Sequence, residues 1–229
     1  PQNLSKSNED RAMIISRFRN GKIYQFDYTS FESKIALYST GDEDFIENYY
    51  DSDLHGETAK IIFDTDDFSA EQREIAKSAN MAIINGSSDA TAIKILEKYP
   101  EPHEKLSKIK TFLRPVFKKS EDVINEVKAN GYFINKWGSI IKPEKDFAAF
   151  NNYLQSTAAE IVVDKVIEVK SLLVGRRSQF MFQVHDSLVF DIHPEEHEII
   201  QELNKLLSYH RGMLFSVDVK HGSNYKNLF

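Results

Sequence analysis

The 229-residue sequence contains no cysteine. This absence excludes disulfides, thiolate metal sites and thiol nucleophiles, and it leaves carboxylates and histidines as metal ligands. A metal bound by such ligands would be a hard cation such as magnesium. The sequence also lacks an apolar run near the ~20 residues that a membrane-spanning helix needs, and it lacks a signal-peptide pattern. We therefore expect a cytoplasmic protein without a membrane partner.

The sequence has no excess of positive charge either. It contains 29 Lys and Arg against 35 Asp and Glu, a net charge of -6, which argues against a simple nucleic-acid coat because such proteins need a basic face. The charges are unevenly spread: acids crowd residues 41–67, whereas bases recur at 105–119 and 170–177. Separate faces of opposite sign and ordinary solvated helix faces both fit this pattern.

Strand-like alternation occurs at both ends of the chain, and helical spacing dominates between them. The predicted strands are residues 22–28, a hairpin over residues 180–192, and residues 215–220. The longer predicted helices are residues 69–84, 147–173 and 195–213. With 41% hydrophobic residues, the chain can bury a core. This order predicts an α+β fold, in which an antiparallel sheet carries a mainly helical insertion.

Two aspartates stand where predicted strands end. Asp27 closes the first strand, and Asp186 lies beside His185 at the tip of the hairpin. If the two strands are neighbours in one sheet, the carboxylates converge on one edge, where two divalent cations ~3.5–4 Å apart can promote an in-line phosphoryl displacement. Oxygen ligands favour Mg²⁺. The alternative is a surface turn whose aspartate caps a backbone group.

The predicted helix over residues 69–84 carries a second motif. Ser69 and Gln72 match a capping box at its start. One face presents residues that recur at every fourth position, namely Arg73, Lys77, Met81 and Asn85. The two cations can grip a triphosphate, or they can belong to a solvated helix face. His55 is a further candidate phosphate ligand, although a single histidine in a polar loop is usually a surface residue.

Three segments occur in the order and spacing of known motifs. Asp27-Tyr-Thr-Ser-Phe-Glu-Ser-Lys34 resembles Asp-Tyr-Ser-Gln-Ile-Glu-Leu-Arg, and residues 73–86 resemble Arg-x-x-x-Lys-x-x-Asn-Phe-Gly-x-x-Tyr-Gly. Gln183-Val-His-Asp-Ser-Leu-Val-Phe190 resembles Gln-Val-His-Asp-Glu-Leu-Val-Phe. These motifs belong to the polymerase core of family-A DNA polymerases, a group that includes bacterial DNA polymerase I and many phage replicases. The resemblance covers nearly the whole chain.

The resemblance implies a right-hand polymerase core without its thumb. The palm would consist of residues 1–41 and 131–229, and the helical fingers of residues 42–130. Such a core, in a bacterial or phage-infected cell, adds deoxynucleotides to a primer 3′ end with two Mg²⁺ ions and releases pyrophosphate. Its partners would be primer-template DNA, a dNTP, and the missing thumb and exonuclease in the same chain or on another. The sequence begins at Pro1, as if cut from a longer chain.

The resemblance also implies roles for individual residues. The implied metal ligands are Asp27, the carbonyl of Tyr28, and Asp186. The implied nucleotide-binding residues are Tyr28, Glu32, His55, Arg73, Lys77, Met81 and Asn85. The implied DNA contacts, which sense base-pair shape in the minor groove, are Asn151, Gln155, Gln183 and His185. Asp27, Asp186 and Lys77 are implied to be catalytic, with Lys77 donating a proton to the departing pyrophosphate.

Some residues depart from the family pattern. Met81 replaces an aromatic residue and Asn85 a tyrosine, which weakens base stacking worth ~1–3 kcal/mol. Ser187 replaces a second acid after Asp186, and Phe147 replaces an arginine that would approach DNA. These changes motivate an alternative function, a non-catalytic DNA-binding module that keeps the polymerase fold. A third option is an unrelated two-aspartate nuclease.

Overall fold

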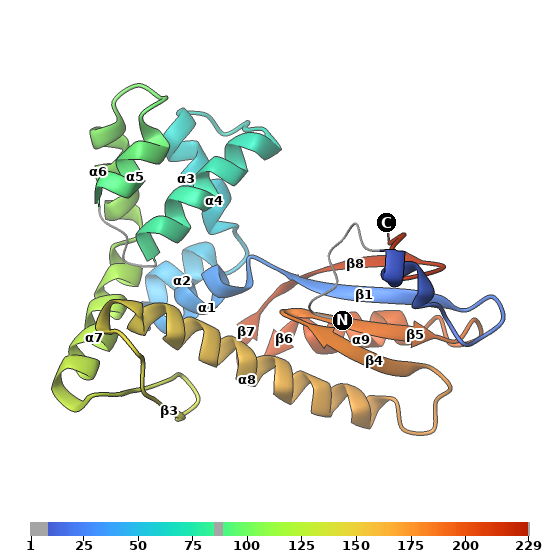
Figure 1. The fold of residues 1–229 in the computed structure, drawn as a ribbon. Coiled ribbons are helices and arrows are strands. Elements are labelled where there is room, and N and C mark those ends of the chain that lie inside the picture. The colour runs from blue at the N-terminus through green and yellow to red at the C-terminus, as the bar shows by residue number, and fades with distance from the viewer. Residues whose placement is uncertain (1–8, 85–88, 229) are drawn as a thin grey trace. The chain divides into compact units, whose positions relative to one another are not determined.

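The chain forms two compact units (Figure 1). The structure, a computed structural model, describes residues 9–84 and 89–228. One unit, called here the sheet unit, comprises residues 1–31 and 158–229, and the other, the helical unit, comprises residues 32–157. The helical unit is thus inserted between the two parts of the sheet unit in the sequence.

A four-stranded antiparallel sheet forms the centre of the sheet unit. Its strands, in spatial order, are β4 (Gln179–Val184), β5 (Ser187–Ile192), β1 (Lys22–Thr29) and β8 (Ser216–Gly222). Alternate residues of β1 point to opposite faces, and Tyr24, Phe26 and Tyr28 are buried on one of them. Phe26 packs edge-on against Phe190 of β5, with ring centroids 5.3 Å apart. The fixed register of this core sets which polar residues share the other face.

The segment after the sheet's hairpin corrects the predicted helix over residues 195–213. Helix α9 covers only Ile199–Leu207, and the next residues form a small hairpin of β6 (Tyr209–His210) and β7 (Met213–Leu214). Two consecutive residues with positive φ, Arg211 (45°) and Gly212 (86°), make its turn. Turns of this kind join antiparallel strands and cannot continue a helix, so the helical spacing of the sequence ends early.

Helices make up most of the helical unit. Its helices are α1 (Phe31–Ser39, beginning at the boundary), α2 (Glu43–Tyr49), α3 (Leu54–Phe63), α4 (Ala70–Ile84), α5 (Asp89–Leu96), α6 (Pro102–Phe112) and α7 (Arg114–Asn130). A short ribbon of β2 (Phe133–Ile134) and β3 (Ile140–Ile141) and a 3-10 turn (Asp146–Ala148) follow. The long helix α8 (Ala149–Leu172) then runs from this unit into the sheet unit.

The start of α4 confirms the predicted capping box. The backbone N–H of Gln72 donates to Ser69 Oγ at 3.2 Å, and the backbone N–H of Ser69 donates to Gln72 Oε1 at 2.7 Å. These bonds satisfy donors that a helix start leaves without partners. Helix α4 packs along α3, burying Ala76, Ala79 and Ile83 on one face. Beside this buried face, Arg73 is partly buried and Lys77 is exposed.

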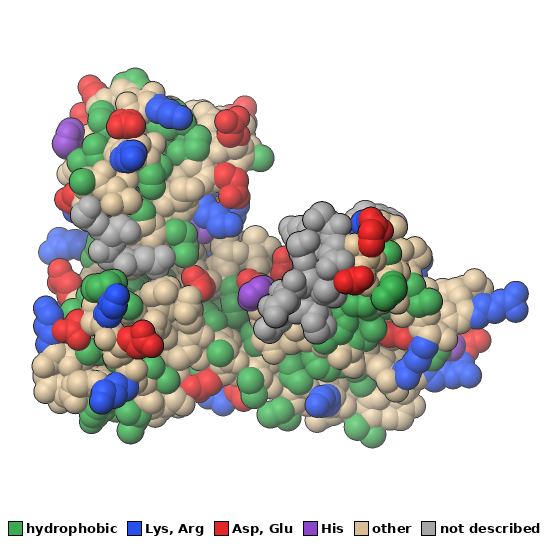
Figure 2. Space-filling view, in the orientation of Figure 1, with side chains coloured by type: hydrophobic (Ala, Val, Ile, Leu, Met, Phe, Trp, Pro, Cys, Tyr) green, Lys and Arg blue, Asp and Glu red, His purple; other side chains and the backbone are tan. Residues whose placement is uncertain are grey.

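Several cations in the basic runs of the sequence pair with nearby acids. In the helical unit, Lys105 pairs with Asp64 at 2.8 Å and Lys110 with Asp89 at 2.5 Å. On the face shown in Figure 2, acidic and basic side chains of this unit are interspersed. On that face the uneven charge of the sequence therefore does not produce a surface of one sign.

The architecture confirms the predicted α+β class, an antiparallel sheet with a helical insertion. Across the described part of the chain, no helix is both long and apolar enough to cross a bilayer.

Candidate functional sites

The predicted acidic edge lies in the sheet unit. Strand β1 pairs with β5 so that Asp27 faces Ser187, and Asp186 is the residue immediately before that partner. The two strands are thus neighbours, which is the condition for their carboxylates to converge. Asp186 occupies the two-residue tip between β4 and β5, where His185 has a φ of 53°. Gln183 Nε2 donates to the His185 carbonyl at 2.8 Å and fixes this tip.

A third carboxylate stands on the same face. Asp218 of β8 is the register partner of Asp27 on its other side, and Lys220 neutralises Asp218 at 3.2 Å. Burial, opposed by Arg11, raises the pKa of the Tyr225 hydroxyl, and the charge of Asp27 raises it further. Like charges directly opposite in a sheet repel each other, and the ion pair of Asp218 with Lys220 reduces that repulsion beside Asp27.

The side chain of Tyr28 belongs to the other face. Its hydroxyl donates to the Leu207 carbonyl at 3.0 Å in the buried core, and burial followed by the charge of Glu168 raises its pKa. Only the backbone carbonyl of Tyr28 is therefore a candidate metal ligand. Oxygen ligands of this kind suit Mg²⁺, which is commonly held by one or two carboxylates together with substrate phosphates. Within the described residues, no group of three or more His, Asp or Glu is arranged to hold a metal.

Ser187 stands where the resemblance predicts a second acid, and its hydroxyl has partners on both sides. Its hydroxyl donates to the Val184 carbonyl at 2.9 Å and accepts from Gln25 Nε2 at 3.0 Å. The residue is 2% exposed, so a carboxylate here would be buried opposite Asp27. Gln25 and Ser187 instead form a neutral bridge from β1 to the turn that carries Asp186. Sequence reasoning missed Gln25, because its partner lies 162 positions away.

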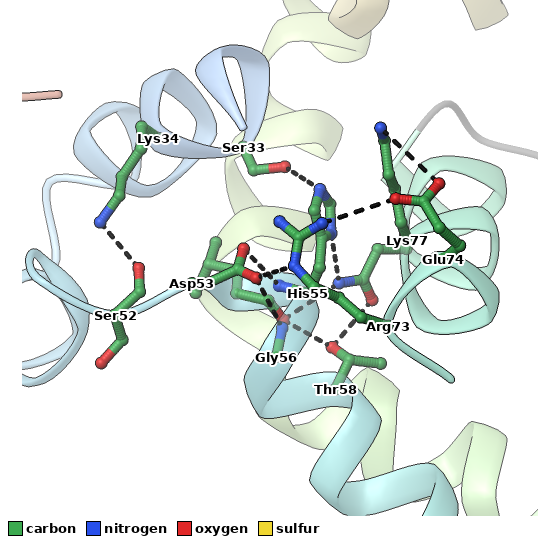
Figure 3. A network of polar contacts seen from close by, with 12 residues as sticks. Ser33, Lys34, Ser52, Asp53, His55, Gly56, Thr58, Arg73, Glu74 and Lys77 are labelled. Atoms are coloured by element: carbon green, nitrogen blue, oxygen red, sulfur yellow. Dashed lines mark hydrogen bonds and ion pairs between the residues drawn. The ribbon is translucent and has the colours of Figure 1, made fainter. Parts of the chain in front are cut away.

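A polar network in the helical unit surrounds Arg73 (Figure 3). Arg73 Nε donates to Asp53 Oδ2 at 2.5 Å. The same carboxylate caps the start of α3, accepting from the backbone N–H groups of His55 (3.3 Å) and Gly56 (3.2 Å). Burial alone would raise the pKa of Asp53, but the hydrogen bond and charge of Arg73 outweigh it and lower the pKa. Asp53 thus ties α4 to the start of α3.

His55 lies in the interior and not in a polar loop. It is 2% exposed within α3. Its Nε2 is 3.1 Å from Ser33 Oγ, and its Nδ1 is 3.2 Å from Asn80 Nδ2. An amide nitrogen can only donate, so we assign the proton to Nε2, which then donates to Ser33. Burial, helped by the charge of Arg73 and opposed by that of Asp53, lowers the pKa of His55 to about 4, so the ring is neutral at pH 7.

The two cations of α4 share one acidic neighbour. Arg73 Nη1 lies 3.6 Å from Glu74 Oε1, and Lys77 Nζ lies 4.0 Å from Glu74 Oε2. The Lys77 side chain is 48% exposed. Met81 follows on the same helix and is half-buried, whereas Asn85 lies outside the described residues. The structure therefore brings Arg73 and Lys77 together on one accessible face.

Lys34 supports this network from α1. It is 6% exposed and donates to the carbonyls of Tyr50 (2.5 Å) and Ser52 (2.7 Å), with a longer bond of 3.4 Å to Tyr49. Burial lowers its pKa, while the charges of Asp51 and Asp53 oppose that change. Lys34 thereby satisfies backbone groups that the end of α2 leaves without helical partners. It also fixes the turn that leads directly to Asp53.

The remaining predicted residues are spread over both units. Glu32 is half-buried on α1, and Asn151 and Gln155 lie on the first turns of α8, all in the helical unit. Gln183 and His185 belong to the sheet unit, beside Asp186. The structure therefore forms two candidate sites, an acidic edge in the sheet unit and a cationic stripe in the helical unit.

Comparisons with known proteins identify the family. The model of DNA polymerase family A matches residues 1–227. The chain is 26% identical over 231 residues to DNA polymerase I of Bacillus subtilis (strain 168), covering 89% of this chain and 25% of the relative. It is 29% identical over 220 residues to DNA polymerase I of Caldicellulosiruptor bescii, covering 87% of this chain and 26% of that relative.

A solved structure shows the same fold. The POL domain of Pol1 from M. smegmatis, in complex with DNA primer-template and dNTP, matches with a TM-score of 0.81 at 22% identity. The match covers 98% of this chain and 44% of that one. The chain spans about a quarter of the length of the curated relatives it matches. On the evidence of the match to nearly all its residues, the chain belongs to DNA polymerase family A.

Proposed function

We propose that the chain is the nucleotidyl-transfer core of a DNA polymerase, which adds a deoxynucleotide to a primer 3′ end on a template and releases pyrophosphate. The observation that supports this most directly is the pairing of β1 with β5, which sets Asp27 opposite the residue that follows Asp186. Two carboxylates on adjacent strands can share divalent cations. The family match supplies the reaction class.

Asp27, the Tyr28 carbonyl and Asp186 would hold Mg²⁺ ions at the acidic edge. When bound, such ions stabilise the entering and leaving oxygens of a phosphoryl displacement. The chain's own contribution is rigidity. The Gln25–Ser187 bridge and the bond from Gln183 to the hairpin tip hold Asp186 in place before any substrate arrives. Positioning of this kind lowers the cost of reaching the reactive geometry.

The cationic stripe of α4 would hold the triphosphate. Arg73 offers a planar fork for phosphate oxygens, while Lys77 offers a point charge on a mobile stem. Lys77 would also donate a proton to the departing pyrophosphate, because a cation at that position assists the leaving group. His55, neutral at pH 7, would contribute an N–H donor by exchanging its bond to Ser33 for one to a phosphate oxygen.

The other assigned residues complete the substrate contacts. Glu32 would exclude a 2′-hydroxyl beneath the sugar, and Met81 and Asn85 would line the base without aromatic stacking. The residues proposed to contact the minor groove of the primer end are Asn151, Gln155, Gln183 and His185. Hydrogen bonds in the minor groove report base-pair shape and carry little sequence information.

Primer extension at enzyme excess tests the function. The chain is incubated with a labelled primer-template, one matching dNTP and Mg²⁺, so that even a slow single turnover is measured. We expect extension by the unmodified chain, loss of at least a hundredfold in Asp186→Asn, and no change in Asp66→Asn, whose carboxylate is 95% exposed. Full extension by Asp186→Asn would refute the metal role. DNA binding without any extension would indicate a binding module, and primer shortening without pyrophosphate a nuclease.

A further inference from the structure

Glu74 bridges the two cations that the proposed function assigns to the triphosphate. Its Oε1 faces Arg73 Nη1 at 3.6 Å, and its Oε2 faces Lys77 Nζ at 4.0 Å. Figure 3 shows its side chain directed toward both. One carboxylate thus offers one oxygen to each cation, as a phosphate group would.

We propose that Glu74 is a built-in competitor for the incoming triphosphate. Its carboxylate occupies the place between Arg73 and Lys77 and leaves when a nucleotide binds. The inference rests on the proposed role of these two cations in binding the triphosphate. It adds that Glu74 fills their binding site when no nucleotide is present. Glu74 would therefore set the nucleotide affinity, and hence the KM for dNTP, without touching the reacting atoms.

The pairs of Glu74 are suited to displacement. The Glu74 side chain is 63% exposed and both of its contacts are long, and ion pairs in water contribute little to stability. A triphosphate carries more charge and more acceptor oxygens, and it accepts two parallel bonds from an Arg fork. The triphosphate therefore displaces the Glu74 carboxylate from Arg73 and Lys77. Its affinity is lower than it would be if these two cations had no carboxylate partner to displace.

Asp53 has the opposite character, although it also pairs with Arg73. Its bond to Arg73 Nε is short, and the same carboxylate caps α3 through His55 and Gly56. Displacing it would cost the helix cap as well as the ion pair. Asp53 thus anchors the Nε side of the guanidinium, whereas Glu74 covers its Nη1 side. Neutralising the anchor is expected to weaken phosphate binding, and neutralising the competitor to strengthen it.

Binding of inorganic tripolyphosphate separates these roles without any catalysis. The full chain is titrated calorimetrically in low-salt buffer with EDTA, so that neither base, sugar nor metal contributes. The variants are Glu74→Gln and a matched control, Glu71→Gln. Glu71 lies on the same helix and is exposed, and it takes part in neither pair of Glu74. Lys77→Met reports whether the cations bind phosphate at all, and thermal melting checks folding.

We expect Glu74→Gln to bind tripolyphosphate about three- to tenfold more tightly than Glu71→Gln, in line with the loss of two exposed ion pairs. The gap should shrink as salt rises, because exposed charges are screened. Equal affinities for the two variants, with Lys77→Met at least threefold weaker than the unmodified chain, would overturn the competitor role alone. Unchanged affinity in Lys77→Met would overturn the phosphate site and the competitor with it.

Discussion

Acid should weaken the helical unit through His55. The pKa of this histidine falls from 6.5 to about 4 on folding, chiefly because burial disfavours its charged form. Between these values the unfolded chain binds a proton that the folded chain does not, so stability is lost as the pH falls from 6.5 towards 4. At 1.36 kcal/mol for each pKa unit, the loss amounts to about 3 kcal/mol.

The single tryptophan provides the assay. Trp137 lies in the helical unit and its Nε1 donates to the Thr157 carbonyl at 3.2 Å, so its fluorescence in urea follows the unfolding of that unit. His55→Gln costs stability at pH 7 by breaking bonds to Ser33 and Asn80. The difference in unfolding free energy between the unmodified chain and this variant should then narrow by about 3 kcal/mol between pH 7 and pH 4.

A matched control excludes general acid effects. His103 is an exposed histidine on α6 of the same unit. The unfolding free energy of His103→Gln should equal that of the unmodified chain at every pH. A difference between the unmodified chain and His55→Gln that stays constant from pH 7 to pH 4 would refute the buried, neutral histidine and the tautomer assigned to it.

Three further predictions concern other polar contacts. Lys34→Met should lower the unfolding free energy of the helical unit, measured in urea, by about 2–4 kcal/mol, because buried carbonyls lose a charged donor. A loss below about 0.5 kcal/mol, which is the usual effect of a surface substitution, would contradict that role. Gln25→Leu removes the bond to Ser187 Oγ. Hydrogen exchange at the backbone amide of Ser187 should become severalfold faster, while the exchange rates of the β8 amides stay unchanged. Burial raises the pKa of Glu196, but hydrogen bonds from the N–H groups of Arg177 and Ser178 outweigh it and hold the pKa at about 2. Acid between pH 4.5 and 2 should therefore destabilise the unmodified chain, seen by circular dichroism, and Glu196→Gln should flatten that dependence.

Local patterns in the sequence predicted the elements that carry the sites. Alternating apolar residues predicted β1 and the hairpin around Asp186, and the Ser69–Gln72 pair predicted the start of α4. Strand alternation and a capping box involve residues only a few positions apart, so both can be recognised in a single sequence. The α+β class and the family also followed, because the motifs keep their order along the chain.

Contacts between distant positions were not predictable in the same way. The ring nitrogens of buried His55 bond to Ser33 and Asn80, which lie 22 and 25 positions away in the sequence. No local pattern distinguishes such a histidine from one in a surface loop. The roles of Lys34 and Gln25 are equally non-local, since each forms its bonds across elements. Helix α9 ended early because the hairpin turn at Gly212 overrode favourable helical spacing.

Anomalous diffraction from bound manganese tests the central claim most directly. Crystals of the chain would be soaked with Mn²⁺ and a dNTP analogue that does not react, and the anomalous map would locate the ions. The account predicts manganese in contact with the carboxylates of both Asp27 and Asp186, and no manganese there in Asp186→Asn. Ions bound elsewhere, or bound equally well in that variant, would contradict the assignment of these two aspartates as metal ligands.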